Sequence, residues 1–147
     1  MAFVALNTTY QKATFEPRYD ADGTVWRQAV AGDTLVAGTP VQIIYNEFGP
    51  VTLALADGTD YTYIGVPIAA AAAADVVWLQ TGGYCAVITT TSTTTAVGYA
   101  LECHDGTILT TGADYDGNDA EFAVSTEVST GTPHSCVLVD RMILQST

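Results

Sequence analysis

The chain has 147 residues, a formal net charge of −12 at pH 7 and a hydrophobic fraction of 48%. This length fits one domain, and so acidic a surface repels the phosphates of nucleic acids and anionic lipids. We therefore expect no nucleic-acid or membrane partner. No apolar stretch reaches the ~18 residues that a transmembrane helix needs. The start of the chain lacks the basic and apolar regions of a signal peptide, and we expect synthesis in a reducing cytoplasm.

Residues 1–24 combine turn formers with weak periodicity, which predicts an extended arm ahead of a single β domain at residues 25–147. Lys12, Arg18 and Arg27 are three of the four basic residues of the chain and lie in or next to this arm. Such a segment could dock onto an acidic partner. An exposed arm with ordinary charges fits the same pattern.

Short runs of β-branched and aromatic residues, separated by turn formers, follow the arm. In this part of the chain we expect strands at 25–30, 34–36, 41–45, 51–55 and 61–66. Asp57-Gly58 is a strong signal for a tight hairpin turn between the last two of them.

The alanines at 69–74 follow Pro67 and predict one short helix that serves as a packed connector, because alanine has the highest helix propensity. The apolar run 76–79 resembles a strand buried on both faces. Thr81-Gly82-Gly83 then predicts a tight turn, with residues 84–88 returning as the hairpin partner.

The second half of the chain repeats the pattern of short strands and turns. We expect strands at 96–103, 108–110, 122–128, 137–139 and 142–144, with the strand at 122–128 on a solvent-exposed edge. Turn signals recur about every 8–12 residues, as in all-β barrels and sandwiches.

The three cysteines, Cys85, Cys103 and Cys136, lack CxxC spacing and allow at most one intramolecular disulfide. In apolar strands, reduced cysteine behaves as a small hydrophobic residue. Together with His104 and His134 they offer zinc ligands, but the adjacent Cys103 and His104 cannot both face inward from one strand. We therefore expect no metal and no cofactor.

The acidic turn Asp114-x-Asp116-x-Asn118 has the alternating oxygen ligands of a calcium loop without the spacing of an EF-hand, so a solvated turn is the simpler interpretation. If an ion binds, this loop is the candidate. Ser135 beside His134 lacks the sequence frame of a nucleophile, and we expect no enzyme. Trp26 and Trp78 fit either a sugar-binding platform or the core.

Four stretches together resemble the small capsid decoration proteins, also called cement or head-stabilising proteins, of tailed bacteriophages. They are AGDTLVAGTPV at 31–41, YIGVPIAAAAAADVVWLQTGGYCAV at 61–87, AVGYALECHDG at 96–106 and the closing VLVDRMIL. The resemblance covers roughly residues 30–144 and leaves the arm unmatched.

This resemblance implies an all-β domain with a small β-barrel or β-clip-like fold that binds the outer surface of a phage capsid as a homotrimer. Its partner would be the major capsid protein, whose lattice it would stabilise on the virion exterior. The residues expected in the arm contact with the capsid are Phe3, Lys12, Phe15, Arg18 and Arg27. Those expected at the trimer interface are Ala70, Ala73 and Trp78. The alternatives are another virion component, such as a head-fibre base or tail element, or a carbohydrate-binding module.

Overall fold

The computed structural model describes residues 13–47, 49–54, 63–88, 96–104, 107–110, 120–128 and 134–140. These residues form strands and connections, which confirms the predicted all-β class. The strands are β1 (Arg18–Tyr19), β2 (Val25–Val30), β3 (Val41–Asn46), β4 (Gly49–Ala54), β5 (Tyr63–Pro67), β6 (Val76–Ile88), β7 (Ala100–His104), β8 (Thr107–Thr110), β9 (Ala120–Ser125) and β10 (His134–Leu138). The described part of the chain contains no helix that is long and apolar enough to cross a membrane.

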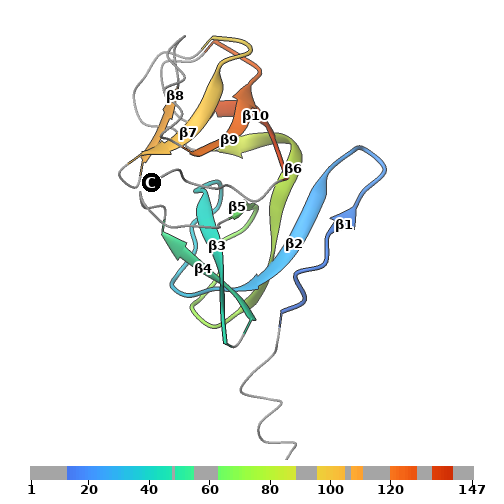
Figure 1. The fold of residues 1–147 in the computed structure, drawn as a ribbon, viewed down its shortest axis with the longest axis vertical. Helices are drawn as coiled ribbons and strands as arrows, with labels where there is room; N and C mark the ends of the chain where they lie inside the picture. The colour runs from blue at the N-terminus through green and yellow to red at the C-terminus, as the bar shows by residue number, and fades with distance from the viewer. Residues whose placement is uncertain are drawn as a thin grey trace, which may run out of the picture.

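Five strands pair into a ring in the order β2-β4-β3-β5-β6, and β6 returns to pair with β2. The contact between β2 and β4 is parallel, through Val30 and Val51, and the other contacts in the ring are antiparallel. A second sheet runs β6-β10-β9-β7-β8 and lies above the ring in Figure 1. The hairpin of β1 and β2 projects to one side of the ring.

Strand β6 belongs to both sheets. Its first half pairs with β2 and β5, and its second half pairs with β10. The predicted hairpin at Thr81-Gly82-Gly83 is therefore wrong: the chain continues as one strand of 13 residues. The register with β2 shifts between Val25 and Trp26, so Thr81 is left without a paired residue opposite and β6 bends there.

The two glycines mark this bend rather than a reversal of the chain. Gly83 has a φ of +85°, and a Cβ on it would lie 2.8 Å from the carbonyl oxygen of Gly23. A Cβ on Gly82 would lie 2.9 Å from Cγ2 of Val25. Glycine is needed because the backbone of the β1–β2 hairpin passes directly against β6 at this point.

The short alanine helix is also a wrong prediction. Ala71 and Leu35 exchange two backbone hydrogen bonds of 2.9 and 3.2 Å, and Ala74 donates to the carbonyl of Ala31 at 2.7 Å. Ala74 has a φ of +72°, which no α-helix allows. Two turns of helix are too few to offset the cost of nucleation, whereas the neighbouring segment 31–35 offers the alanine backbone ready partners.

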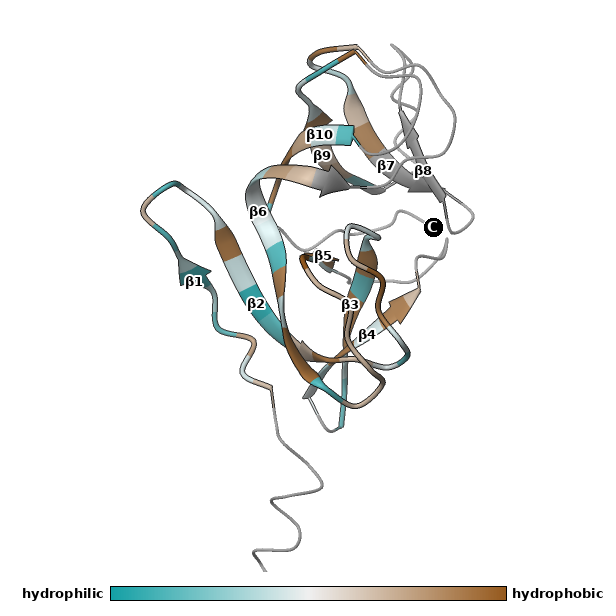
Figure 2. Cartoon of the chain, turned by 180° about the vertical axis from the view of Figure 1, so that it is seen from behind, coloured by the Kyte–Doolittle hydropathy of each residue, from teal (hydrophilic) through white to brown (hydrophobic). Residues whose placement is uncertain are grey.

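Two apolar clusters hold the sheets together. The first lies in the ring and consists of Ala29, Ala31, Leu35, Val41, Ile43 and Leu79. The second lies between β5, β6 and the other sheet and consists of Ile64, Val66, Cys85, Leu101, Phe122, Ala123, Cys136 and Leu138. Figure 2 shows the hydrophobic colour along strands of both sheets, interrupted by hydrophilic residues on β1 and β2.

Strand β9 is not the edge strand that its alternating pattern predicts. It lies between β10 and β7, and β8 forms the edge. The register with β7 shifts between Leu101 and Glu102, which turns Phe122 into the core although Val124 is 38% exposed. The bulge breaks the simple alternation on which the prediction rests.

Candidate interaction surface

An exposed group of aromatic and cationic side chains lies where the β1–β2 hairpin meets β6. We call it the aromatic patch, and it consists of Arg18, Trp26 and Trp78. The Arg18 guanidinium carbon lies 4.8 Å from the ring centroid of Trp78 and 5.8 Å from that of Trp26. Both distances are within the range of a cation–π interaction. Trp78 is 38% exposed.

The β1–β2 turn fixes the position of the patch. Arg18 pairs across the strands with Trp26, and the indole nitrogen of Trp26 donates to the Asp20 carboxylate at 2.9 Å. The other carboxylate oxygen of Asp20 lies 3.5 Å from Nε of Arg18. Trp78 enters from β6, opposite Gln28 of β2. The patch is therefore built by strand pairing and does not need a bound partner to form.

Arg27 points away from this patch and into the molecule. It donates two hydrogen bonds to the Asp140 carboxylate at 2.9 and 3.0 Å, and one to the carbonyl of Phe15 at 2.8 Å. Its guanidinium also lies 4.7 Å from the Phe15 ring centroid and 4.6 Å from that of Tyr63. The phenyl ring of Phe15 in turn packs edge-on against Tyr45 and Tyr63.

Ionic contact shifts the pKa of both charged groups in this pair. The hydrogen bond to Asp140 raises the pKa of Arg27 above its usual value, although burial opposes the shift. Burial alone would raise the pKa of Asp140, but the hydrogen bonds and charge of Arg27 outweigh it and leave that pKa below its usual value. Both groups are therefore charged at neutral pH and fasten the end of β10 to β2.

The residues that the sequence predicts for capsid and trimer contacts fall into three groups. Phe3 and Lys12 lie outside the described residues, as do Asp114, Asp116 and Asn118 of the acidic loop. Phe15 and Arg27 contact each other inside the molecule. Arg18 and Trp78, assigned from the sequence to different interfaces, are in contact on the same surface. Ala70 and Ala73 are exposed in the connection that leads into β6.

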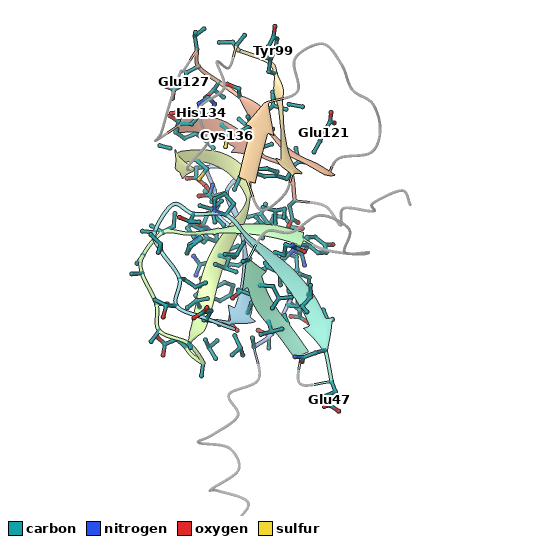
Figure 3. The ribbon with its side chains drawn as sticks, turned by 90° about the vertical axis from the view of Figure 1, so that its left-hand side faces the viewer. Glu47, Tyr99, Glu121, Glu127, His134 and Cys136 are labelled. Atoms are coloured by element: carbon teal, nitrogen blue, oxygen red, sulfur yellow. The ribbon has the colours of Figure 1, made fainter. Side chains whose placement is uncertain are left out.

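A buried polar cluster lies at the other end of the molecule, where the connection between β9 and β10 begins and ends. Nε2 of His134 lies 2.9 Å from Oγ of Ser125, and Nδ1 lies 3.9 Å from Oε1 of Glu127. Glu127 also accepts a hydrogen bond from the backbone N–H of Ser135 at 2.9 Å. Figure 3 shows Glu127, His134 and Cys136 together on the second sheet, with Tyr99 beyond them.

Serine, histidine and glutamate are also the residue types of a nucleophilic triad, but the hydrogen bonds here run in the opposite direction. The Ser125 hydroxyl lies 2.8 Å from the carbonyl of Glu127 and donates its one proton there. Nε2 of His134 must then carry the proton that Ser125 accepts, whereas a general base would accept the serine proton. Ser125 is 1% exposed and His134 is fully buried. The cluster clamps the ends of the connection and presents no nucleophile.

Burial lowers the pKa of His134, and the charge of Glu127 opposes this shift. His134 and Cys136 both face the core. In the described residues, no group of three or more histidine, cysteine, aspartate or glutamate side chains is placed to hold a metal ion. Ser135, the nucleophile candidate from the sequence, has its hydroxyl 3.3 Å from that of Tyr84.

Sequence reasoning missed the partners of these groups. Asp140 meets Arg27 across 113 residues of sequence, and Ser125 and Glu127 meet His134 across a strand connection. No local pattern marks any of them, because each contact depends on strand register.

The fold is similar to that of a solved structure described as "The crystal structure of head fiber gp8.5 N base in bacteriophage phi29". The TM-score is 0.54 and the sequence identity is 18%, over 81% of this chain and 97% of the solved one. No family model matches the sequence, and no curated protein does. At this identity the likeness establishes the fold: the chain shares the β architecture of a head-fibre base.

Proposed function

We propose that the protein is a structural component of a bacteriophage virion that attaches to the outer surface of the head. The observation that carries this proposal is the fold likeness, which spans nearly the whole of a domain described as a head-fibre base. The motifs at 31–41, 61–87 and 96–106 support it independently, because they resemble proteins that decorate phage capsids. Both similarities favour a binding role without catalysis.

In the finer form of the proposal, a homotrimer binds the major capsid protein and stabilises its lattice on the virion exterior. A ligand that binds the assembled shell alone stabilises that shell by mass action. The second candidate is a head-fibre base, which attaches a further appendage to the head. A base that binds single capsid subunits as tightly as it binds the shell adds no stability to the lattice. The description of the similar structure favours this second candidate.

The aromatic patch is the best candidate for the contact. Tryptophan and arginine, the residue types of this patch, are enriched among the residues that supply most of the binding energy at protein interfaces. Arg18 and Arg27 are the cations among the described residues, and Arg27 is already held by Asp140. Arg18 lies 3.5 Å from the Asp20 carboxylate, but its side chain is 53% exposed, so its guanidinium can also contact an acidic partner.

Co-sedimentation with isolated heads of the cognate phage tests the attachment, and light scattering measures the mass of the free protein. We expect saturable binding to heads. A mass of three times 15.4 kDa would support the trimer. A protein that stays in the supernatant at all head concentrations would contradict the proposal.

The substitution Trp78→Ala tests the patch. We expect it to weaken binding to heads by about tenfold or more, the effect of removing an aromatic anchor from the centre of an interface. Tyr99→Ala is the matched control, because Tyr99 is 39% exposed and immediately precedes β7 of the second sheet, away from the patch. Equal binding by both variants and the wild type, with unchanged melting temperatures, would exclude the patch as the contact.

The two candidate roles differ in their effect on the head. A decoration protein raises the temperature at which heads release DNA, because its binding energy is added to the lattice. A fibre base that binds single capsid subunits as tightly as it binds the shell leaves that temperature unchanged. Heating heads with and without saturating protein, and recording the release of DNA with an intercalating dye, distinguishes the two roles.

A further inference from the structure

Two of the three cysteines face each other across the strands that join the two sheets. Cys85 of β6 is the direct register partner of Cys136 of β10. Their side chains are 2% and 0% exposed, and both belong to the apolar cluster between the sheets. Neither of the two forms a disulfide in this structure. The third, Cys103, lies on β7, separated from β10 by β9.

The register places these cysteines at a distance that a disulfide can bridge. Directly opposed residues of an antiparallel pair have Cβ atoms about 4.5–5.5 Å apart, and a disulfide needs about 3.5–4.5 Å. The shortest Cβ separation of opposed residues therefore equals the longest Cβ separation of a disulfide, at about 4.5 Å. The register of β10 with β6 is irregular between His134 and Cys136. The ladder is therefore already interrupted next to the pair, where a small approach of the two strands disturbs few regular hydrogen bonds.

The thiols are already in contact, and their surroundings keep them protonated. The hydrogen bond with Cys85, together with burial, holds the pKa of Cys136 far above its usual value. Because the thiolate is the reactive form, the pair is slow to react while the strands stay closed. Reaction therefore requires local opening of β10 from β6, or an oxidant small enough to reach the core.

We infer that Cys85 and Cys136 form a latent cross-link that closes under oxidising conditions and locks the second sheet to the ring. In the reaction with oxidised glutathione, one thiolate attacks the glutathione disulfide and releases one reduced glutathione. The second cysteine then attacks the mixed disulfide and releases another. The protein loses two electrons and two protons, and the glutathione disulfide gains them.

The cross-link closes a chain loop of about fifty residues, which constrains the unfolded state strongly. It also fastens β10, whose following residue Asp140 holds Arg27 of β2. A protein made in a reducing cytosol and then released from the cell passes from the open to the cross-linked form. This inference does not depend on the proposed function, because it concerns the folded chain alone.

The test uses the Cys103→Ser variant of the full chain, which leaves only the opposed pair. The reduced variant is incubated with oxidised glutathione at a temperature just below its melting point, where β10 opens transiently. We expect a monomer lighter by two hydrogen atoms, with no free thiol after denaturation. Its melting temperature should rise by roughly 5–12 °C and fall back on reduction.

The variants Cys85→Ala and Cys136→Ala, each combined with Cys103→Ser, are the controls. They have no second thiol nearby, so the same treatment should give mixed glutathione adducts and no rise in melting temperature. If either control is unstable, the reduced form of Cys103→Ser serves as the reference. Glutathione adducts or covalent dimers of Cys103→Ser, or a lower melting temperature of the cross-linked form, would overturn the inference.

Discussion

Arg27 is held inside the molecule by groups from distant parts of the chain. Asp140 follows β10, Phe15 precedes β1 and Tyr63 begins β5. The side chains of Arg27 and Asp140 are 12% and 13% exposed. At this depth an ion pair does not stabilise greatly by its own attraction, but removal of one partner leaves the other as an uncompensated buried charge.

We expect Asp140→Asn to lower the free energy of unfolding by about 3 kcal/mol, the usual result of breaking a buried ion pair. The double variant Arg27→Met with Asp140→Leu should recover much of this loss, because neither charge is then buried alone. Urea denaturation of Asp140→Asn, the double variant, its component single variants Arg27→Met and Asp140→Leu, and the wild type measures these differences. If the double variant is as unstable as the sum of its single variants, the pair is not coupled in this way.

His134 gives the stability of the protein a dependence on pH near neutrality. Its pKa in the folded state is lowered, so the folded protein keeps the imidazole neutral where the unfolded chain takes up a proton. This contribution to stability is complete above the unfolded pKa of about 6.5 and is lost as the pH falls from there toward the folded value.

We therefore expect the melting temperature to fall between about pH 7 and pH 5 by more in the wild type than in His134→Gln. Glutamine keeps a side-chain amide within reach of Ser125 and does not titrate in this range. His104 and the carboxylates are common to both proteins and cancel in the comparison. If the melting temperatures of the two proteins fall equally between pH 7 and pH 5, His134 is not the group responsible for the pH dependence.

At the scale of single elements, strand β6 determines the architecture. It pairs with β2 and β5 in the ring and with β10 in the second sheet, so two apolar clusters depend on it. The change from one sheet to the other takes place between Thr81 and Gly83. A side chain at Gly83 would meet the Gly23 carbonyl and the Cα of Thr24, both of them backbone atoms that cannot turn aside.

We expect Gly83→Ala to destabilise the fold by roughly 1–3 kcal/mol through its positive φ, and by more through the contact with the β1–β2 hairpin. Gly98→Ala is the matched control, because Gly98 has nearly the same φ of +88° and an added Cβ there would meet no atom within 4 Å. Urea denaturation of the two variants separates backbone strain from steric contact. Equal losses would show that the approach of the hairpin adds nothing.

At the scale of the whole molecule, the sequence predicts the class and most strands of the fold but not the way they join. The periodicity of residues 25–30 and 41–45 is sufficient to identify β2 and β3 nearly to their ends. Hydrophobic patterns cannot show that the glycines at 82 and 83 bend one strand, because Thr-Gly-Gly also forms hairpin turns. The alanine segment fails for a similar reason: local propensity favours a helix, and the partners at 31–35 are visible only in three dimensions.

The candidate surface could likewise be predicted from the sequence only in part. Arg18 and Trp78 could be selected from the sequence by residue type, as a cation in the arm and an aromatic residue near the alanines. The contact between them could not be predicted from the sequence, because it depends on the pairing of β1, β2 and β6. The same holds for Cys85 and Cys136, whose opposition follows from the register of β10 on β6.

The order of the strands also sets the order in which the protein can be completed during synthesis. Every strand of the ring precedes residue 89, whereas the second sheet needs residues up to Leu138. A chain leaving the ribosome can therefore close its ring while the β7–β10 region is still being made. Asp140 is synthesised after all of these strands, so the ring can form before Arg27 has its ionic partner. The ion pair between the ring and the end of β10 can therefore form only after synthesis has passed residue 140.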